Sequence, residues 1–199
     1  GSRAARSSSW PRAAKFEPAI TKSVISTVER QGQPGARSSP SHRFHHGADW
    51  GKNRDWTIFT SYRESREGPD VLARWERRGR ESWPAMVGTY NALVSGWGGQ
   101  ACHDVTGIGD VISDYLTVDS YGMNFSRLAE RDDMLNRYIS DAEHGEIAGP
   151  FIRFAYDEHK YLTREEVYGR KHLPDSVASA AHARDAGRVG GAGKHMIER

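Results

Sequence analysis

Hydrophobic and polar residues alternate along three short segments of the chain, 44–49, 55–64 and 71–79. A period of two residues is typical of a β-strand that buries one face. The sequence Gly-Pro-Asp at 68–70 separates the second segment from the third, and these residue types favour a hairpin connection,. The patterns predict three consecutive antiparallel strands.

A helical period replaces this alternation at 82–97, where Ser82 is the expected N-cap and Pro84 lies in the first turn,. Further strands are expected at 100–105, 118–125, 147–154 and 167–172, and further helices at 110–116, 126–146, 157–166 and 175–186. Ser126 and Gly145 are the expected ends of the longest helix. This order predicts an α/β fold with a mixed sheet, in which three antiparallel strands precede parallel crossovers and helices cover both faces.

The two ends of the chain differ from this core in composition. Residues 1–42 are rich in Ser, Arg, Pro and Gly, which favours a flexible extension or linker,. Within them, apolar residues recur every four positions from Phe16 to Val28 and predict one short helix,. Residues 187–199 are rich in glycine and are expected to form a flexible tail, which leaves 43–186 as the predicted domain,.

Composition limits the classes of function. A chain of 199 residues with 37% hydrophobic residues is long enough for one globular domain,. Its apolar runs fall short of the roughly 18–20 residues that cross a bilayer, which argues against a membrane-spanning protein and a membrane partner. Cys102 is the single cysteine, so no internal disulfide forms and a reducing cytoplasmic compartment is expected,. The formal net charge of +2 neither favours nor excludes a nucleic-acid partner,.

Asp49 and Asp104 close predicted strands, and Asp175 opens the last predicted helix. Functional groups of α/β sheets converge at strand ends and helix starts, so these three carboxylates are expected to meet in one cleft. Carboxylates gathered without a cation repel one another, and oxygen ligands favour Mg²⁺ or Mn²⁺. The pattern therefore indicates a site for divalent metal ions. The structural alternatives are a turn shaped by Asp49 and Asp55 and an N-cap at Asp175.

Histidine and tryptophan residues flank two of these acids. His45, His46 and His103 match no zinc-ligand spacing, so hydrogen-bonded or solvated histidines are expected,. Trp50 and Trp56 are expected to pack around the turn that lies between them,.

Three motifs carry a resemblance to a known family: "GADWGKNRDWTIF" at 47–59, "HDVTGIGDVISDYL" at 103–116 and "HLPDSVASAAHA" at 172–183. Together with the segment 126–152, and in this order, they resemble the nuclease domain of the large terminase subunit of tailed bacteriophages. The resemblance spans about residues 43–186. It implies an RNase H-like fold, which agrees with the mixed sheet predicted from the hydrophobic pattern.

The resemblance also implies roles for individual residues. Asp49, Asp104 and Asp175 match the family's catalytic acids, which hold two divalent metal ions, Mg²⁺ or Mn²⁺. Asp55 matches an auxiliary acid and His172 a histidine near the last catalytic acid, and both are expected at the metal site. Contacts to DNA phosphates are expected from Lys52, Arg54 and Lys171, which border the site, and from a wider set, Arg74, Arg77, Arg78, Arg80 and Arg170,.

The implied function is a metal-dependent endonuclease that cuts concatemeric phage DNA by two-metal phosphodiester hydrolysis, with little sequence preference, in the cytoplasm of the infected bacterial host. The sequence contains no Walker motif, so an ATPase domain or subunit is an expected partner,. The small terminase subunit, the portal and double-stranded DNA are the other expected partners. Two alternatives remain open: a junction resolvase or transposase-type nuclease on the same fold, and a non-catalytic DNA-binding or docking module whose acids act as caps.

Overall fold

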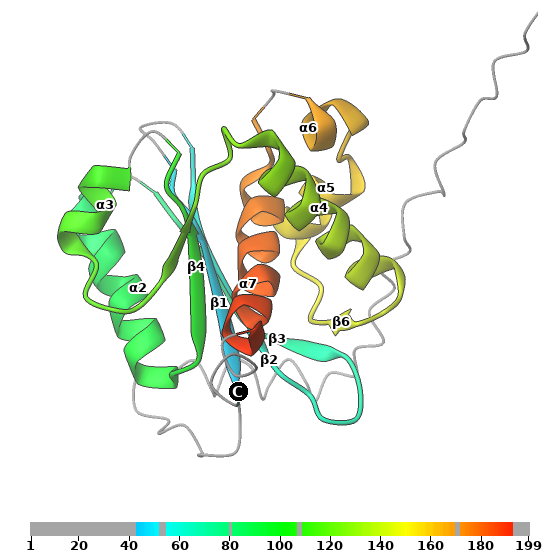
Figure 1. Cartoon of the computed structure of the whole chain (residues 1–199), viewed down its shortest axis with the longest axis horizontal. Helices are drawn as coiled ribbons and strands as arrows, with labels where there is room; N and C mark the ends of the chain where they lie inside the picture. Colours follow the sequence, from blue (N-terminus) through cyan, green and yellow to red (C-terminus); the bar gives the residue numbers. More distant parts are fainter. Residues whose placement is uncertain (1–42, 52–54, 80, 107–108, 170–171, 193–199) are drawn as a thin grey trace, which may run out of the picture.

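The computed structural model describes residues 43–51, 55–79, 81–106, 109–169 and 172–192 (Figure 1). The predicted extension at 1–42 and the end of the predicted tail at 193–199 lie outside the described residues. So do five of the expected phosphate contacts, Lys52, Arg54, Arg80, Arg170 and Lys171.

Six strands form one mixed sheet in the order β5-β4-β1-β2-β3-β6. They are β1 (Phe44–Asp49), β2 (Thr57–Arg63), β3 (Asp70–Arg78), β4 (Gln100–Asp104), β5 (Tyr121–Met123) and β6 (Ile147–Ala148). β1 pairs antiparallel with β2, and β2 with β3, whereas β4 is parallel to β1, β5 to β4 and β6 to β3. The predicted order of three antiparallel strands followed by parallel crossovers is confirmed.

Helices cover both faces of this sheet, as predicted. The described helices are α2 (Trp83–Trp97), α3 (Gly109–Tyr115), α4 (Leu128–Glu143), α5 (Arg153–Lys160), α6 (Arg164–Tyr168) and α7 (Asp175–Ala192). α2 and α3 lie on one face, and α7 crosses the other face with α4, α5 and α6 outside it (Figure 1). Phe59 and Tyr90 belong to the core on the α2 side, whereas Leu135 and Ala181 belong to the core around α7. No helix among the described residues is long and apolar enough to cross a membrane.

The strand predicted at 147–154 is wrong beyond its first two residues. β6 ends at Ala148, and the chain enters α5 at Arg153. Pro150 has no N–H to donate to a strand ladder, so it limits the length of β6,. Gly149 approaches β3 so closely that a Cβ atom would lie 2.7 Å from the Leu72 side chain.

The single helix predicted at 157–166 is also wrong, because two helices, α5 and α6, occupy this region. Thr163 and Glu166 form a capping box that starts α6: the Thr163 hydroxyl accepts from the Glu166 N–H, and the Glu166 carboxylate accepts from the Thr163 N–H,. The strand predicted at 167–172 is absent from the described part of that segment, where Val167 lies inside α6.

Two helix ends differ from their predictions. Arg127, not Ser126, is the N-cap of α4: the N–H and the hydroxyl of Ser126 both donate to the Asn124 carboxamide oxygen in a turn before the helix,. Gly145 follows the end of α4 with a φ of 71°, as expected of a helix stop,. α7 continues past its predicted end at 186 and reaches Ala192.

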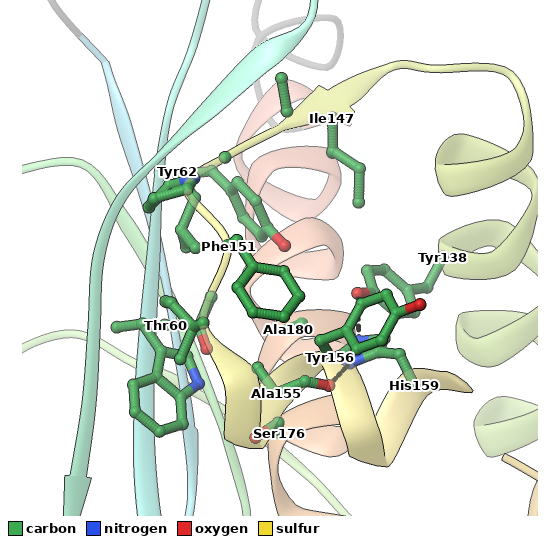
Figure 2. Close-up of a pocket in the computed structure, with 16 residues that line it drawn as sticks. Thr60, Tyr62, Tyr138, Ile147, Phe151, Ala155, Tyr156, His159, Ser176 and Ala180 are labelled. Carbon is green, nitrogen blue, oxygen red and sulfur yellow. Dashed lines mark hydrogen bonds between the residues drawn. The ribbon is translucent and has the colours of Figure 1, made fainter. Parts of the chain in front are cut away.

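Aromatic side chains hold α5 against the sheet and its neighbouring helices. The rings of Phe154 from α5 and Trp75 from β3 have centroids 6.0 Å apart. The hydroxyl oxygen of Tyr138 from α4 lies 2.7 Å from Nε2 of His159. Figure 2 shows Tyr138 and His159 beside a small cavity of about 70 Å³, which residues of β3, α5 and α7 also line. These contacts fix the position of α5.

α7 lies in backbone contact with β1. A Cβ atom on Gly47 would lie 2.1 Å from the Ser179 carbonyl oxygen and 2.3 Å from the Ala183 nitrogen. The Ser179 hydroxyl is buried and lies 3.1 Å from the Gly47 carbonyl oxygen. The helix and the strand can therefore pack this closely only if residue 47 has no side chain.

Gly47→Ala is expected to lower the free energy of unfolding by about 3 kcal/mol, because its methyl group would overlap the backbone of α7,. Gly88→Ala is the matched control: nothing lies within 4 Å of the added Cβ atom. Inside α2 that change is expected to raise the free energy of unfolding by roughly 0.5–1 kcal/mol. Urea unfolding followed by circular dichroism measures both, and equal stability of the two variants would contradict the close contact of β1 with α7.

Candidate active site

The three predicted acids lie where the sequence placed them. Asp49 ends β1, Asp104 ends β4 and Asp175 begins α7. Because β1 and β4 are neighbouring parallel strands, their last residues lie at the same edge of the sheet,. A cleft of about 650 Å³ opens at this edge and is lined by Asp49, Asp104, Asp55 and His172. Asp175 is not among the described residues that line this cleft, but its negative charge raises the pKa of Asp49, so it lies near the acids that do.

The carboxylates at this site repel one another. Burial raises the pKa of Asp49 well above its usual value, and the negative charges of Asp175 and Asp104 raise it further,. Burial also raises the pKa of Asp175, to about 6. The Trp56 N–H opposes this second shift, because it donates to the Asp175 carboxylate from 3.1 Å and favours the charged form,. The Trp56 N–H thus favours the charged carboxylate of Asp175, but it does not compensate for the solvation that this carboxylate loses on burial.

Glu158 of α5 is a further acid at this site that the sequence did not predict. Its carboxylate accepts from the Ser176 N–H at 2.8 Å, in the first turn of α7, and its charge raises the pKa of both Asp49 and Asp175. Glu158 lies in the middle of a helix, so no strand end or motif marked it. Glu158 reaches the site only because α5 packs beside the start of α7.

Asp104 also shapes the backbone around it. Its carboxylate accepts from the Thr106 N–H at 2.7 Å, and the Thr106 hydroxyl accepts from the Phe125 N–H at 2.8 Å. The end of β4 is thereby tied to the loop that follows β5. An amide side chain at position 104 would keep the first of these hydrogen bonds, since it retains a carbonyl oxygen.

Gly51, just after β1, lies close to Asp55 and Thr57. A Cβ atom on Gly51 would lie 2.4 Å from the Asp55 carbonyl oxygen, and the Gly51 N–H donates to the Thr57 hydroxyl at 3.1 Å. Trp50 is buried, as predicted, and packs edge-on to core aromatic rings. Trp56 differs from the prediction of simple packing, because 40% of it is exposed and its ring carries a stacked guanidinium group.

The histidines near the site take different roles. His46 lies 2.8 Å from the Ser61 hydroxyl through Nδ1 and 2.8 Å from the Gly98 carbonyl oxygen through Nε2, so the predicted hydrogen-bonded histidine is confirmed there. Burial lowers the pKa of His46 to about 4. His172 is exposed, and its Nε2 lies 4.0 Å from the Asp175 carboxylate. Within the described ranges, no three His, Cys, Asp or Glu side chains are grouped closely enough to hold a metal ion as they stand.

Comparison with known proteins gives one consistent family. No protein-family model matches the chain. The terminase large subunits of Thermus phage G20c and Thermus virus P23-45 are each 30% identical to it in an alignment of 159 residues, which covers 72% of this chain and 32% of each relative. A crystal structure of the G20c large terminase nuclease with bound magnesium has 25% identity and a TM-score of 0.61, over 75% of this chain and 84% of that one. The chain belongs to the family of phage terminase large subunits and corresponds to their nuclease domain.

The terminase nuclease relatives confirm the RNase H-like α/β fold class predicted from the sequence. The G20c nuclease has also been crystallised with bound zinc and with bound cobalt. The chain spans about a third of the length of the terminase large subunits that it matches.

Asp175→Asn is expected to stabilise the metal-free protein at about pH 8 and to change its stability little at about pH 4. The pKa of Asp175 is about 6 in the folded protein and 3.8 ordinarily, so the folded state binds this proton more tightly than the unfolded state. Stability from this group is therefore lost as pH rises through that window. The shift corresponds to about 3 kcal/mol, of which the variant is expected to recover about 2 kcal/mol, because Asn still accepts from the Trp56 N–H.

Urea unfolding in EDTA at both pH values measures this effect. A difference between variant and wild type that is the same at both pH values would contradict the raised pKa.

Proposed function

We propose that this chain is a metal-dependent DNA endonuclease of a phage DNA-packaging terminase. The observation that carries the proposal is the meeting of Asp49 and Asp104 at adjacent strand ends, in a cleft where other acids raise the pKa of the buried Asp49. A divalent cation would remove the repulsion among these carboxylates. The family relation supports the same activity.

The donor set fits hard divalent cations. Carboxylate oxygens are preferred by Mg²⁺ and Mn²⁺, and the ions bound by the G20c nuclease support a divalent cofactor here,. Asp49, Asp104 and Asp175 would hold two such ions, with Asp55 and His172 at the margin of the site. Because no three of the described side chains are yet grouped closely enough, binding would draw the carboxylates together.

When bound, two such ions would activate a water molecule and stabilise the negative charge that develops on the phosphodiester. The residues of the chain would orient the site. Asp49 is buried, and the charges of Asp175 and Asp104 both raise its pKa, so it would be a ligand shared by the bound ions. The N–H groups of Trp56 and Thr106 fix the carboxylates of Asp175 and Asp104.

The substrate in this proposal is double-stranded phage DNA, cut with little sequence preference in the cytoplasm of the infected bacterial host. Phosphate contacts would supply most of the affinity. Lys52, Arg54 and Lys171 remain predicted contacts. An ATPase domain or subunit, the small terminase subunit and the portal are the proposed partners, by analogy with the terminases that this chain resembles.

Asp104→Asn is expected to reduce metal-dependent cleavage of supercoiled plasmid by about a hundredfold or more, because it removes a ligand charge. It keeps the oxygen that accepts from the Thr106 N–H, so folding is expected to persist. Asp114→Asn on the exposed surface of α3 is the matched control and is expected to cut like the wild type. Agarose-gel assays in Mg²⁺, Mn²⁺ and EDTA measure the activity.

The alternatives give different results in the same assay. A folded wild-type chain that cuts nothing would favour the non-catalytic docking module. Cleavage of four-way junctions in preference to linear duplex would favour the junction resolvase.

Adding Mg²⁺ or Mn²⁺ to the EDTA-treated chain is expected to raise its thermal midpoint, because an ion that binds only the folded state stabilises it. The gain is about 2.7 kcal/mol when the ion is at a hundred times its dissociation constant. Asp49→Asn is expected to lose this gain, whereas Asp114→Asn is expected to keep it. Differential scanning fluorimetry measures the midpoint, and an equal rise in Asp49→Asn would contradict the role of Asp49 as a ligand.

A further inference from the structure

The guanidinium group of Arg77 lies between two aromatic rings. Its central carbon is 4.4 Å from the ring centroid of Trp56 and 4.4 Å from that of Phe154. A guanidinium held by its faces keeps its N–H groups directed outward, around the edge of the plane. Arg77 is exposed, so these donors are accessible.

Most of the described arginines are held by carboxylates, but Arg77 takes part in none of the ion pairs among the described residues. Arg74 and Arg78, on the same strand, both pair with Glu76. Side chains alternate along a strand, so these three residues share one face of β3. Arg77 lies on the other face with Trp75, which also packs on Phe154.

Arg77 is close to the acid cleft. It pairs across the sheet with Ile58, at the start of β2 and just after Trp56. The backbone N–H of Trp56 donates to the carboxylate of Asp175, and Asp55 lines the cleft. A single residue, Trp56, therefore contacts both the cation and one of the proposed catalytic acids.

We propose that Arg77 binds a DNA phosphate at the rim of the acid cleft and so positions the strand for cleavage. The inference rests on the proposed function, and it gives a defined geometry to one of the phosphate contacts expected from the sequence. The acids repel a polyanion, so exposed cations beside them are needed to hold DNA there, and Arg77 is one such cation among the described residues,. A planar, preoriented guanidinium matches the two oxygens of a phosphate and loses little freedom when it binds.

Arg77→Gln is expected to weaken binding of a short fluorescein-labelled duplex of mixed sequence by about three- to tenfold at near-physiological salt. The slope of log affinity against log salt is expected to become less steep by about one unit, as for the loss of one phosphate contact. Fluorescence anisotropy in EDTA measures both without cleavage, and circular dichroism confirms that each variant folds.

Three further variants separate phosphate binding from packing. Arg66→Gln removes the same charge from the exposed connection at the other end of the β2–β3 hairpin and is expected to bind like the wild type. Arg77→Lys keeps the charge without the planar group, so its salt slope is expected to stay near that of the wild type. Phe154→Leu keeps Arg77 but removes one stacking face, and a smaller loss of affinity is expected.

The outcomes distinguish this inference from the proposed nuclease. If the wild type binds DNA and does not cut it, the nuclease proposal fails, and the variants still test Arg77. If Arg77→Gln folds and binds with the affinity and salt slope of the wild type, or if the wild type does not bind the duplex, the inference is overturned. An equal loss in Arg66→Gln would also overturn it, because the effect would then be that of net charge alone.

Discussion

The contact of α7 with β1 is the constraint on which the candidate site depends. The two elements run in opposite directions: His45 approaches Gly187, Gly47 approaches Ser179 and Ala183, and the line of contact leads to Asp49 and Asp175 at one end. Small residues at a spacing of four make this possible, because they bring one face of the helix onto the strand backbone. The relative position of the two acids is therefore set by packed regular elements and not by loops, which favours a well-defined site.

The close packing of β1 and α7 also explains why a charged carboxylate is unfavourable at Asp49. Asp49 lies in the same buried layer that joins β1 to α7, so its carboxylate loses solvent and gains like-charged neighbours. Backbone N–H groups donate to three nearby carboxylates: Trp56 donates to Asp175, Thr106 to Asp104 and Ser176 to Glu158. Those groups orient each oxygen but carry no net charge, so they cannot cancel the repulsion. The folded chain is thus poised for an external cation, which is the physical basis for the metal proposal.

The sequence predicted the parts of the fold that have a long or regular pattern. Alternation located β1 to β3, and strand ends located Asp49 and Asp104, because a parallel sheet brings such ends together. It failed at 147–172, where β6 has two residues and shows no period, and where Pro150 and the Thr163 capping box divide the chain into short elements. The sequence did not predict the place of Glu158 at the site or the exposed stacking of Trp56, for a related reason. Both depend on where α5 packs, and that position follows from contacts distant in sequence.

α5 packs on the Arg77 cation and also carries one of the acids near the site, Glu158. Phe154 and Glu158 are four residues apart, so they lie on the same side of the helix. The first packs on the Arg77 guanidinium, and the second accepts from the start of α7. One short helix thus contacts both the Arg77 guanidinium and the first turn of α7, which begins at Asp175. Any displacement of α5 would move both groups together, so the placement of a phosphate on Arg77 and the electrostatics around Asp175 are not independent. A DNA strand bound at the rim would hold the same helix that shapes the acid site, which links substrate positioning to the geometry of the carboxylates.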